Sequence, residues 1–296
     1  MAMTTIMGAL ELGLILALMS VGMFISFRIL NIPDLTVDGS FTLGSAFAAT
    51  FAVQGQSGTG VLLAVVAGAL AGAVTGLLQT KLKIQPILSG ILTMTALYSV
   101  NLWIMGNKPN LSFFGKDTLF TPFERFLPEL AAKIVPILLL LAIVTILIRL
   151  FLGTQLGLSL RATGDNEDMV RASSINSDAM KILGLSLSNA IVSLAGAVMA
   201  QYQVYADISG GIGMMVIGLA SIIVGQALLG QKGGVTRGFV AAITGAVVYR
   251  FILTFALQSG MASNDLKILS AALVVIAISI PEVKKFIQKR RARRHA

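Results

Sequence analysis

The residue types that usually do chemistry are scarce in this sequence, and their spacing excludes the common catalytic sites. There is no Cys, and the one His, His295, lies in a basic tail, so we expect no metal site and no histidine proton relay. The nearest approach to a phosphate-binding loop, Gly115-Lys116-Asp117, lacks the Ser or Thr that would hold Mg²⁺. Zinc-protease and serine-hydrolase motifs are absent as well. The sequence therefore predicts a chain that is not an enzyme and holds no cofactor of its own.

The chemically richest segment is a polar stretch, Leu158–Lys181, between two long apolar segments. It must lie outside a bilayer, because a charged side chain at the bilayer centre costs on the order of 3 kcal/mol. Asp165 and Asn166 are suited to cap a short helix over Glu167–Ala172, with acids at its positive end and Arg171 toward its other end. A solvated loop fits the composition equally well. Either structure makes this stretch the expected meeting point with another molecule.

The rest of the chain has the composition of a membrane protein. Hydrophobic residues make up 56% of the 296 residues and charged residues 12%, and the mean hydropathy is +0.88. Continuous apolar runs of about 18 residues or more are long enough to cross the bilayer as helices. We predict an all-α, polytopic helical membrane protein with about nine transmembrane helices. The expected crossings are Ile6–Phe27, Leu35–Val53, Thr59–Thr80, Gln85–Met105, Ile134–Phe151, Ile182–Tyr202, Met214–Leu229, Phe239–Leu257 and Leu266–Ile280.

The distribution of Lys and Arg predicts the orientation. Residues 282–296 form a basic tail, which the positive-inside rule places in the cytoplasm; nine crossings then leave the N-terminus outside. This arrangement puts sixteen of the 22 Lys and Arg residues on the cytoplasmic side. We therefore expect one transmembrane domain, 1–281, with a polar loop at 154–181 and a cytoplasmic tail. The basic fringe is expected to meet anionic membrane lipids rather than nucleic acid.

A weak internal repeat is compatible with this count. Asp34-Leu35-Thr36 and Asp207-Ile208-Ser209 each follow a long apolar segment and precede a segment of small residues. Crossings one to four and six to nine would then be inverted copies joined by the fifth, an arrangement in which transporters place a pathway between repeats. Chance and the general use of small residues at helix interfaces explain the matches equally well.

Three motifs carry a resemblance to a known family. They are G-x-x-L-R-A-x-G-x-N at Gly157–Asn166, followed by Ile175-Asn176, then the segment Asn31–Ala49, and then Tyr205–Gly225. Together they resemble the permease subunits of ABC importers of the branched-chain amino acid and ribose type, in particular a subgroup of aromatic amino acid or uncharacterised uptake systems. The resemblance covers essentially the whole chain. It implies a bacterial cell membrane location, a pathway formed with a second copy of the chain, and a separate cytoplasmic ATPase that binds ATP and Mg²⁺.

The resemblance also implies roles for individual residues. The loop helix would dock on the ATPase through a set of seven residues: Arg161, Gly164, Asp165, Asn166, Asp168, Arg171 and Ala172. The family usually has Gly before Ile175, where this chain has Ser174. We expect Ser174 to adopt the turn only with a negative φ.

Polar residues in the apolar segments are the candidates for a translocation pathway. They are Asp34, Thr36, Asp38, Thr93, Asn101, Gln201 and Asp207. Ordinary structural roles are open for several of them: Asp34 and Asp38 would cap the second crossing, Asp207 the seventh, and Thr93 would bond its own i−4 carbonyl. Glu11 is either a pathway residue or an acid at the interface. Tyr98, Trp103, Tyr202 and Tyr205 fit an aromatic belt at the outer surface.

The long loop Asn107–Lys133 is expected on the outer face, where an importer of this family receives a substrate-binding protein. Its charged residues Lys116, Asp117, Glu124, Arg125 and Glu129 are the candidates for that docking. We predict a permease subunit that transports a small solute, an amino acid by resemblance. A self-sufficient secondary transporter or channel is the alternative, and a structural membrane scaffold is weaker because it leaves the polar loop unexplained.

Overall fold

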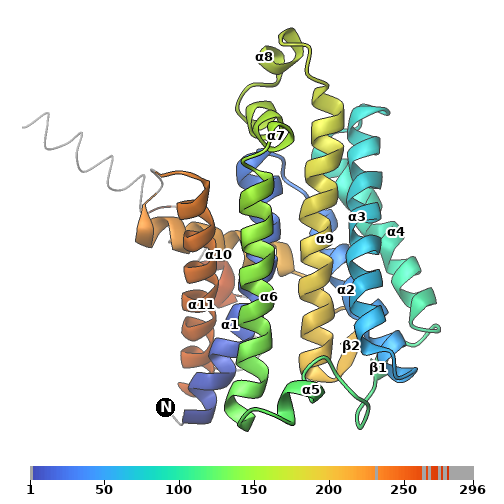
Figure 1. Ribbon diagram of the computed structural model, residues 1–296, viewed down its shortest axis with the longest axis vertical. Helices are drawn as coiled ribbons and strands as arrows, with labels where there is room; N and C mark the ends of the chain where they lie inside the picture. The colour runs from blue at the N-terminus through green and yellow to red at the C-terminus, as the bar shows by residue number, and fades with distance from the viewer. Residues whose placement is uncertain are drawn as a thin grey trace, which may run out of the picture.

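The computed structural model describes residues 3–230 and 233–261, with residues 265, 268–272, 275 and 279 beyond them (Figure 1). The described part is almost entirely helical. The long helices are α1 (Met3–Phe24), continued by the π-helical η1 (Ile25–Ile29), α2 (Thr36–Val53), α3 (Ser57–Thr80), α4 (Pro86–Ile104), α6 (Glu129–Phe151), α9 (Ser177–Gln203), α10 (Met214–Leu229) and α11 (Val235–Gln258). The short elements are β1 (Asn110–Ser112), α5 (Thr121–Glu124), α7 (Gln155–Asp165), α8 (Glu167–Ala172) and β2 (Tyr205–Asp207).

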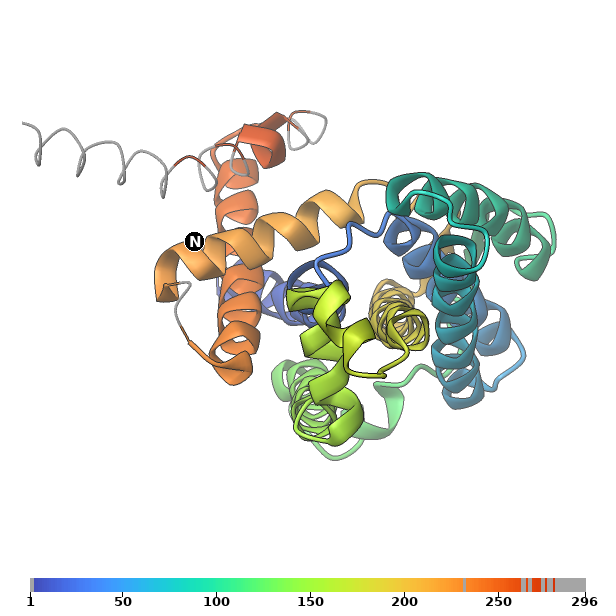
Figure 2. The same cartoon turned by 90° about the horizontal axis from the view of Figure 1, so that it is seen from above.

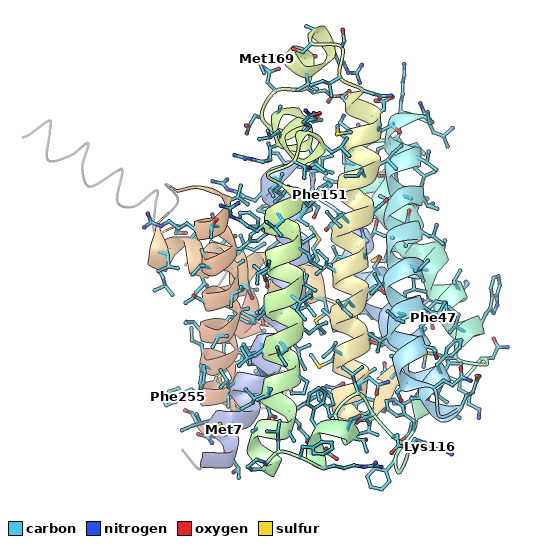
Figure 3. All side chains as sticks on the ribbon, viewed as in Figure 1. Met7, Phe47, Lys116, Phe151, Met169 and Phe255 are labelled. Atoms are coloured by element: carbon cyan, nitrogen blue, oxygen red, sulfur yellow. The ribbon has the colours of Figure 1, made fainter. Side chains whose placement is uncertain are left out.

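The two ends of the helix bundle carry different elements. Helices α7 and α8 cover one end, which we call the α8 end, and Met169 on α8 marks it in Figure 3. At the other end, β1 and β2 pair antiparallel with Leu111 opposite Ala206, and α5 lies at this end too; we call it the β end. Lys116 marks the β end in Figure 3. The polar loop and the long charged loop are therefore on opposite ends, as the predicted topology requires.

Eight of the nine predicted crossings coincide with helices, and the ninth, Leu266–Ile280, lies largely outside the described residues. Within the described part, six helices are long and apolar enough to span a membrane, including α1 with η1 and α9. Helices α2 and α10 are not among them. Figure 2, in which α6 and α9 are seen end-on, shows α10 along its length. The expectation of a simple crossing at Met214–Leu229 is therefore wrong: this 16-residue helix lies across the bundle instead of along it.

Helices α1 and α9 form the centre of the bundle. Their membrane-spanning windows are 83% and 78% buried, against 22–39% for α3, α4, α6 and α11. The outer helices present large apolar side chains to the surface, among them Leu62, Leu92 and Leu139. Such exposed Leu residues are unfavourable in water but match a lipid environment.

Small residues let α9 approach its neighbours at backbone distance. A Cβ atom on Gly44 of α2 would overlap the carbonyl oxygen of Ser193 in α9, and one on Gly196 of α9 would overlap the carbonyl oxygen of Phe41 in α2. Because lipid tails are as apolar as core side chains, helix association in a membrane depends on such close packing. The α2–α9 contact therefore has no room for side chains at these two positions.

This packing predicts opposite outcomes for two glycine substitutions. Gly196→Ala should lower the free energy of unfolding by about 2 kcal/mol, because the added methyl group overpacks the α2–α9 contact. Gly8→Ala in α1 is the matched control, since nothing lies within 4 Å of the new methyl group; it should leave the stability unchanged or raise it by up to about 1 kcal/mol. Thermal unfolding of the detergent-solubilised protein measures both. Equal melting temperatures would contradict the packing argument.

Candidate functional site

Helices α7 and α8 form a built structure on the bundle end. The Thr154 side chain caps α7 at the Gly157 amide, and the Asn166 side chain caps α8 by accepting from the Met169 amide at 3.1 Å. The predicted short helix over Glu167–Ala172 is thereby confirmed, and Asn166, rather than Asp165, is its cap. Helix α7 was not predicted. It is anchored by the fully buried Leu160.

Charged side chains attach α8 to the first turns of α9. Glu167 at the start of α8 accepts from Lys181 of α9 at 2.6 Å and from Arg171 at 2.8 Å. Arg171 also donates to Ser177 at 2.9 Å and forms an ion pair with Asp178 at 3.4 Å. We call these five residues the α8 anchor. The hydrogen bond from Lys181, followed by that from Arg171, holds the pKa of the Glu167 carboxyl below its ordinary value despite partial desolvation.

The predicted docking residues divide into two groups. Arg161, Asp165 and Asp168 are exposed and available to a partner, and Asn166 and Ala172 are exposed beside them. Gly164, in contrast, faces the bundle, because a Cβ there would overlap the carbonyl oxygen of Ile29 in η1. Arg171 is engaged in the α8 anchor.

The turn after α8 corrects one expectation. Ser174 has a φ of +61°, so the prediction that its φ stays negative is wrong. A side chain in this left-handed conformation costs about 1 kcal/mol or more. The turn still closes α8, with the Ile175 amide donating to the Val170 carbonyl at 3.2 Å.

A buried polar cluster lies where the chain breaks between η1 and α2. The Asn189 side chain of α9 donates to the Asp34 carboxyl at 2.6 Å, and the other Asp34 oxygen accepts from the Thr36 amide at 2.9 Å. The Thr36 hydroxyl contacts that of Thr75 in α3 at 2.7 Å, and Thr75 reaches Thr93 in α4 at 2.9 Å. Three predicted pathway residues, Asp34, Thr36 and Thr93, therefore meet here. Thr93 also bonds its i−4 carbonyl, Ser89, as expected.

Asp38 caps a helix far away in the sequence. Its two carboxyl oxygens accept from the amides of Gly213 and Met215, at 2.9 and 2.7 Å, at the start of α10. This arrangement satisfies donors that a helix N-terminus leaves open and places an acid at the positive end of the helix dipole. The expectation that Asp38 caps the second crossing is wrong. Asp207 likewise does not cap α10; it accepts from the Ser209 amide at 2.7 Å, at the end of β2.

A pocket of about 270 Å³ lies between α2, α4 and the segment before α10. Asp38 and Asn101, two predicted pathway residues, line it together with Thr42, Thr95 and Tyr98. Asn101 is 1% exposed, and its amide nitrogen donates to the Gly39 carbonyl at 3.2 Å. Tyr98, assigned to an aromatic belt from the sequence, is thus also a pocket residue.

The remaining predicted residues lie apart from the cluster and the pocket. Gln201 is buried near the β end, where it bonds the Ala48 carbonyl and the Leu119 amide. Glu11 is also buried, and it accepts from the Tyr202 hydroxyl at 2.7 Å. Both connect helices rather than line the pocket. Four of the predicted docking residues are exposed at the β end: Lys116, Asp117, Glu124 and Arg125. For Glu129 the structure describes the backbone, in α6, and not the side chain.

Sequence reasoning missed several residues that organise these sites. Asn189 and Thr75 lie in apolar helices and complete the buried cluster. An amide in the middle of a crossing is costly unless it is bonded, so Asn189 could have been recognised on that ground. Glu167 and Lys181 were read as parts of a polar loop, and their pairing could not be read from spacing alone. Among the described residues, no three His, Cys, Asp or Glu side chains converge as metal ligands would.

The fold and these sites together define a class of protein. In the described part of the chain, six helices are long and apolar enough to span a membrane, polar residues lie buried among them beside a broken backbone, and a structured polar loop covers one end of the bundle. These features describe a multi-pass membrane transport protein.

Comparison with known proteins identifies the family. The chain belongs to the permease component of the branched-chain amino acid transport system family, whose sequence model matches residues 5–279. It is 39% identical to the tyrosine transport system permease protein of Clostridioides difficile, over 98% of this chain and 96% of that one. It is 33% identical to an uncharacterised protein of Rickettsia prowazekii, over 96% and 99%, and 27% identical to the ribose import permease protein of Escherichia coli, over 91% and 83%. No solved structure is similar enough to count as a match.

The α8 anchor predicts a pH-dependent attachment of α8. Because the pKa of Glu167 is lower in the folded anchor than in a free carboxyl group, the attachment is complete above the ordinary Glu pKa of about 4.3 and is lost as pH falls through the lowered value. Since the chain has no Cys, a spin label on Met169→Cys reports α8 mobility directly. We expect mobility to rise only under acidic conditions.

Two variants test the assignment to Glu167. Glu167→Gln should leave α8 mobile at every pH, because the neutral amide cannot replace the charge paired with Lys181. Asp168→Asn should keep the wild-type pH profile, because Asp168 forms no ion pair with another described residue. A wild-type profile in Glu167→Gln would show that the anchor is held by other contacts.

Proposed function

We propose that this chain is the membrane-spanning subunit of an ATP-driven bacterial importer, coupled to a separate cytoplasmic ATPase and to an external substrate-binding protein. Membership of the permease family supports the importer. The observation that carries the coupling is the α7–α8 structure, which presents exposed Arg161, Asp165 and Asp168 while its other face is fixed to η1 and α9. Because α7 and α8 are fixed to the bundle on one face, a displacement of these helices by a partner would be transmitted to the bundle. The chain itself would carry no catalytic residues.

The proposed substrate is an amino acid. Its support is the C. difficile relative, which is named a tyrosine transport permease and matches nearly the whole chain. The ribose import permease of E. coli is a more distant relative. A pathway would include Asp38 and Asn101, which line a pocket that is partly open at the surface of the chain. Because the pocket is partly open at the surface of one chain, a second copy of the chain could close it and complete the pathway.

The proposed orientation puts the α8 end in the cytoplasm. Arg28, Lys81, Arg149 and Arg161 lie at or near this end, whereas Lys108, Lys116 and Arg125 belong to the loop at the β end. This distribution follows the positive-inside rule and supports a cytoplasmic α8 end. The basic tail, residues 282–296, lies outside the described residues and the ninth crossing largely so, and both stay as predicted from the sequence.

An inverted repeat remains part of the proposal. Asp34 accepts from the Thr36 amide and Asp207 from the Ser209 amide, at 2.9 and 2.7 Å, so both motifs form the same turn. The helix packing is also reciprocal: α9 packs on α2 and α3, and α1 packs on α10 and α11. These parallels support two related halves joined by α6.

The coupling role predicts the loss of one specific partner. Purification of the chain from its native membrane in mild detergent should bring down an ATPase with a phosphate-binding loop, identified by mass spectrometry. Arg161→Ala with Asp165→Ala should abolish this association, because both exposed charges of α7 are removed. Lys116→Ala with Asp117→Ala is the matched control, since it removes one cation and one anion at the opposite end, and the ATPase should remain bound. Recovery of the wild-type chain alone would favour the secondary transporter.

The docking role predicts the complementary result at the β end. Lys116→Glu with Glu124→Lys keeps the net charge but inverts the surface pattern, so the affinity for the binding protein should fall about tenfold. ATP-driven uptake in proteoliposomes at a limiting concentration of binding protein should fall with it. The association with the ATPase should be unchanged. Full uptake by the exchanged variant would exclude these two residues from the docking surface.

A further inference from the structure

The walls of the α2–α4 pocket include a segment of irregular backbone. Ile208 and Ile212 line it from the segment between β2 and α10, which ends where Asp38 caps α10. Non-helical backbone at membrane depth is tolerated only where it is buried in protein or lines a cavity. This segment, which lines the pocket, is therefore a part of the chain where such an exception applies.

The two threonine hydroxyl groups of the pocket have already donated their hydrogens. Thr42 donates to the carbonyl of Asp38 at 3.1 Å, and Thr95 donates to the carbonyl of Ile91 at 2.8 Å. Each hydroxyl oxygen can then only accept a further hydrogen bond.

Asn101 supplies an acceptor that has no donor. One hydrogen of its amide nitrogen is donated to the Gly39 carbonyl, while the amide oxygen is buried and bonds no other described residue. A buried acceptor without a partner costs about 1–3 kcal/mol. A ligand that donates a hydrogen bond at this point would recover that cost.

Asp38 adds negative charge to the same pocket. Each of its oxygens accepts one α10 amide and keeps a further lone pair. No Lys or Arg is among the residues described as lining the pocket. The pocket thus combines the Asn101 oxygen and the two Thr oxygens with a carboxylate that no Lys or Arg of the described lining neutralises, and this combination favours a cation with several N–H donors.

We propose that this pocket is a transit site for the ammonium group of an amino-acid substrate, which Asn101 and Asp38 receive while Met94, Tyr98, Ile208 and Ile212 contact its apolar body. The inference rests on the proposed function and adds to it the group that is recognised and the residues that recognise it. The substrate carboxylate is not needed for this recognition, so a primary amine without a carboxylate should occupy the pocket as well.

A thiol placed in the pocket tests occupancy without relying on transport. Met94→Cys adds the only cysteine of the chain and leaves all the acceptors in place. The full chain in lipid nanodiscs is labelled with a small thiol reagent in the presence of tyramine, tyrosine or 3-(4-hydroxyphenyl)propanoate. Tyramine and tyrosine should slow the labelling. The propanoate, which has the ring and the carboxylate but no amine, should not slow it at the same concentration.

Three further substitutions in the Met94→Cys background assign the recognition to Asn101. Asn101→Leu should weaken protection by tyramine about tenfold, because the acceptor for a charged donor is lost. Asn101→Asp restores an acceptor in the same shape and should retain protection, which separates recognition from a folding defect. Thr145→Val in α6 is the matched control, because it removes another buried oxygen without a described partner. In this variant tyramine should slow the labelling as much as in the Met94→Cys parent.

The outcomes separate this inference from the proposed function. Equal protection by the propanoate and by tyramine, or unchanged protection in Asn101→Leu, overturns the ammonium site. ATP dependence of uptake by the Met94→Cys chain, reconstituted with its ATPase and binding protein, is measured in parallel. Uptake that does not depend on ATP overturns the proposed function. The ammonium site would still be supported in that case if only the amines slow the labelling.

Discussion

The hydrogen bond between Asp34 and Asn189 is the interaction on which the centre of this structure depends. A carboxyl group buried inside a membrane protein is stable only if its oxygens are bonded. Asn189 bonds one oxygen and the Thr36 amide bonds the other, so the break between η1 and α2 is fixed against the middle of α9. Thr36 then extends the cluster to Thr75 and Thr93. Four helices are positioned by one chain of polar contacts.

This centre is connected to the α8 end through continuous, rigid elements. Lys181, which pairs with Glu167 of α8, and Asn189, which bonds Asp34, lie about two turns apart on α9. In parallel, Gly164 of α7 rests on the Ile29 carbonyl, just before the same break. A displacement of α7 and α8 by a partner would therefore reach the α1–α2 break along both routes. Gly196 brings the backbones of α9 and α2 into direct contact, so no flexible side chain lies between them that could absorb such a displacement.

The sequence predicts the local features of this protein far better than its long-range contacts. Continuous apolar runs placed eight helices, and Asn166 predicted the start of α8, because hydropathy and capping act over a few residues. The cap of α10 by Asp38 could not be predicted, since the two lie far apart in the chain and their proximity exists only after folding. The turn at Ser174 was mispredicted because surrounding contacts can impose a conformation that the isolated residue disfavours.

Asp34 and Asp38, the two acids of the α2 region, have different surroundings. This difference explains how most of the bundle can stay fixed while the position of α10 changes. Asp34 is enclosed by α9 and its own backbone, whereas Asp38 lies beside the pocket and holds α10 through two amides only. A group that donates to Asp38 weakens its hold on these amides, because the same carboxylate charge is shared. Occupation of the pocket is thereby linked to the position of α10, while the Asp34 cluster keeps the other helices in place. In the proposed site, the acid that would receive the ammonium group is the same one that holds the start of α10.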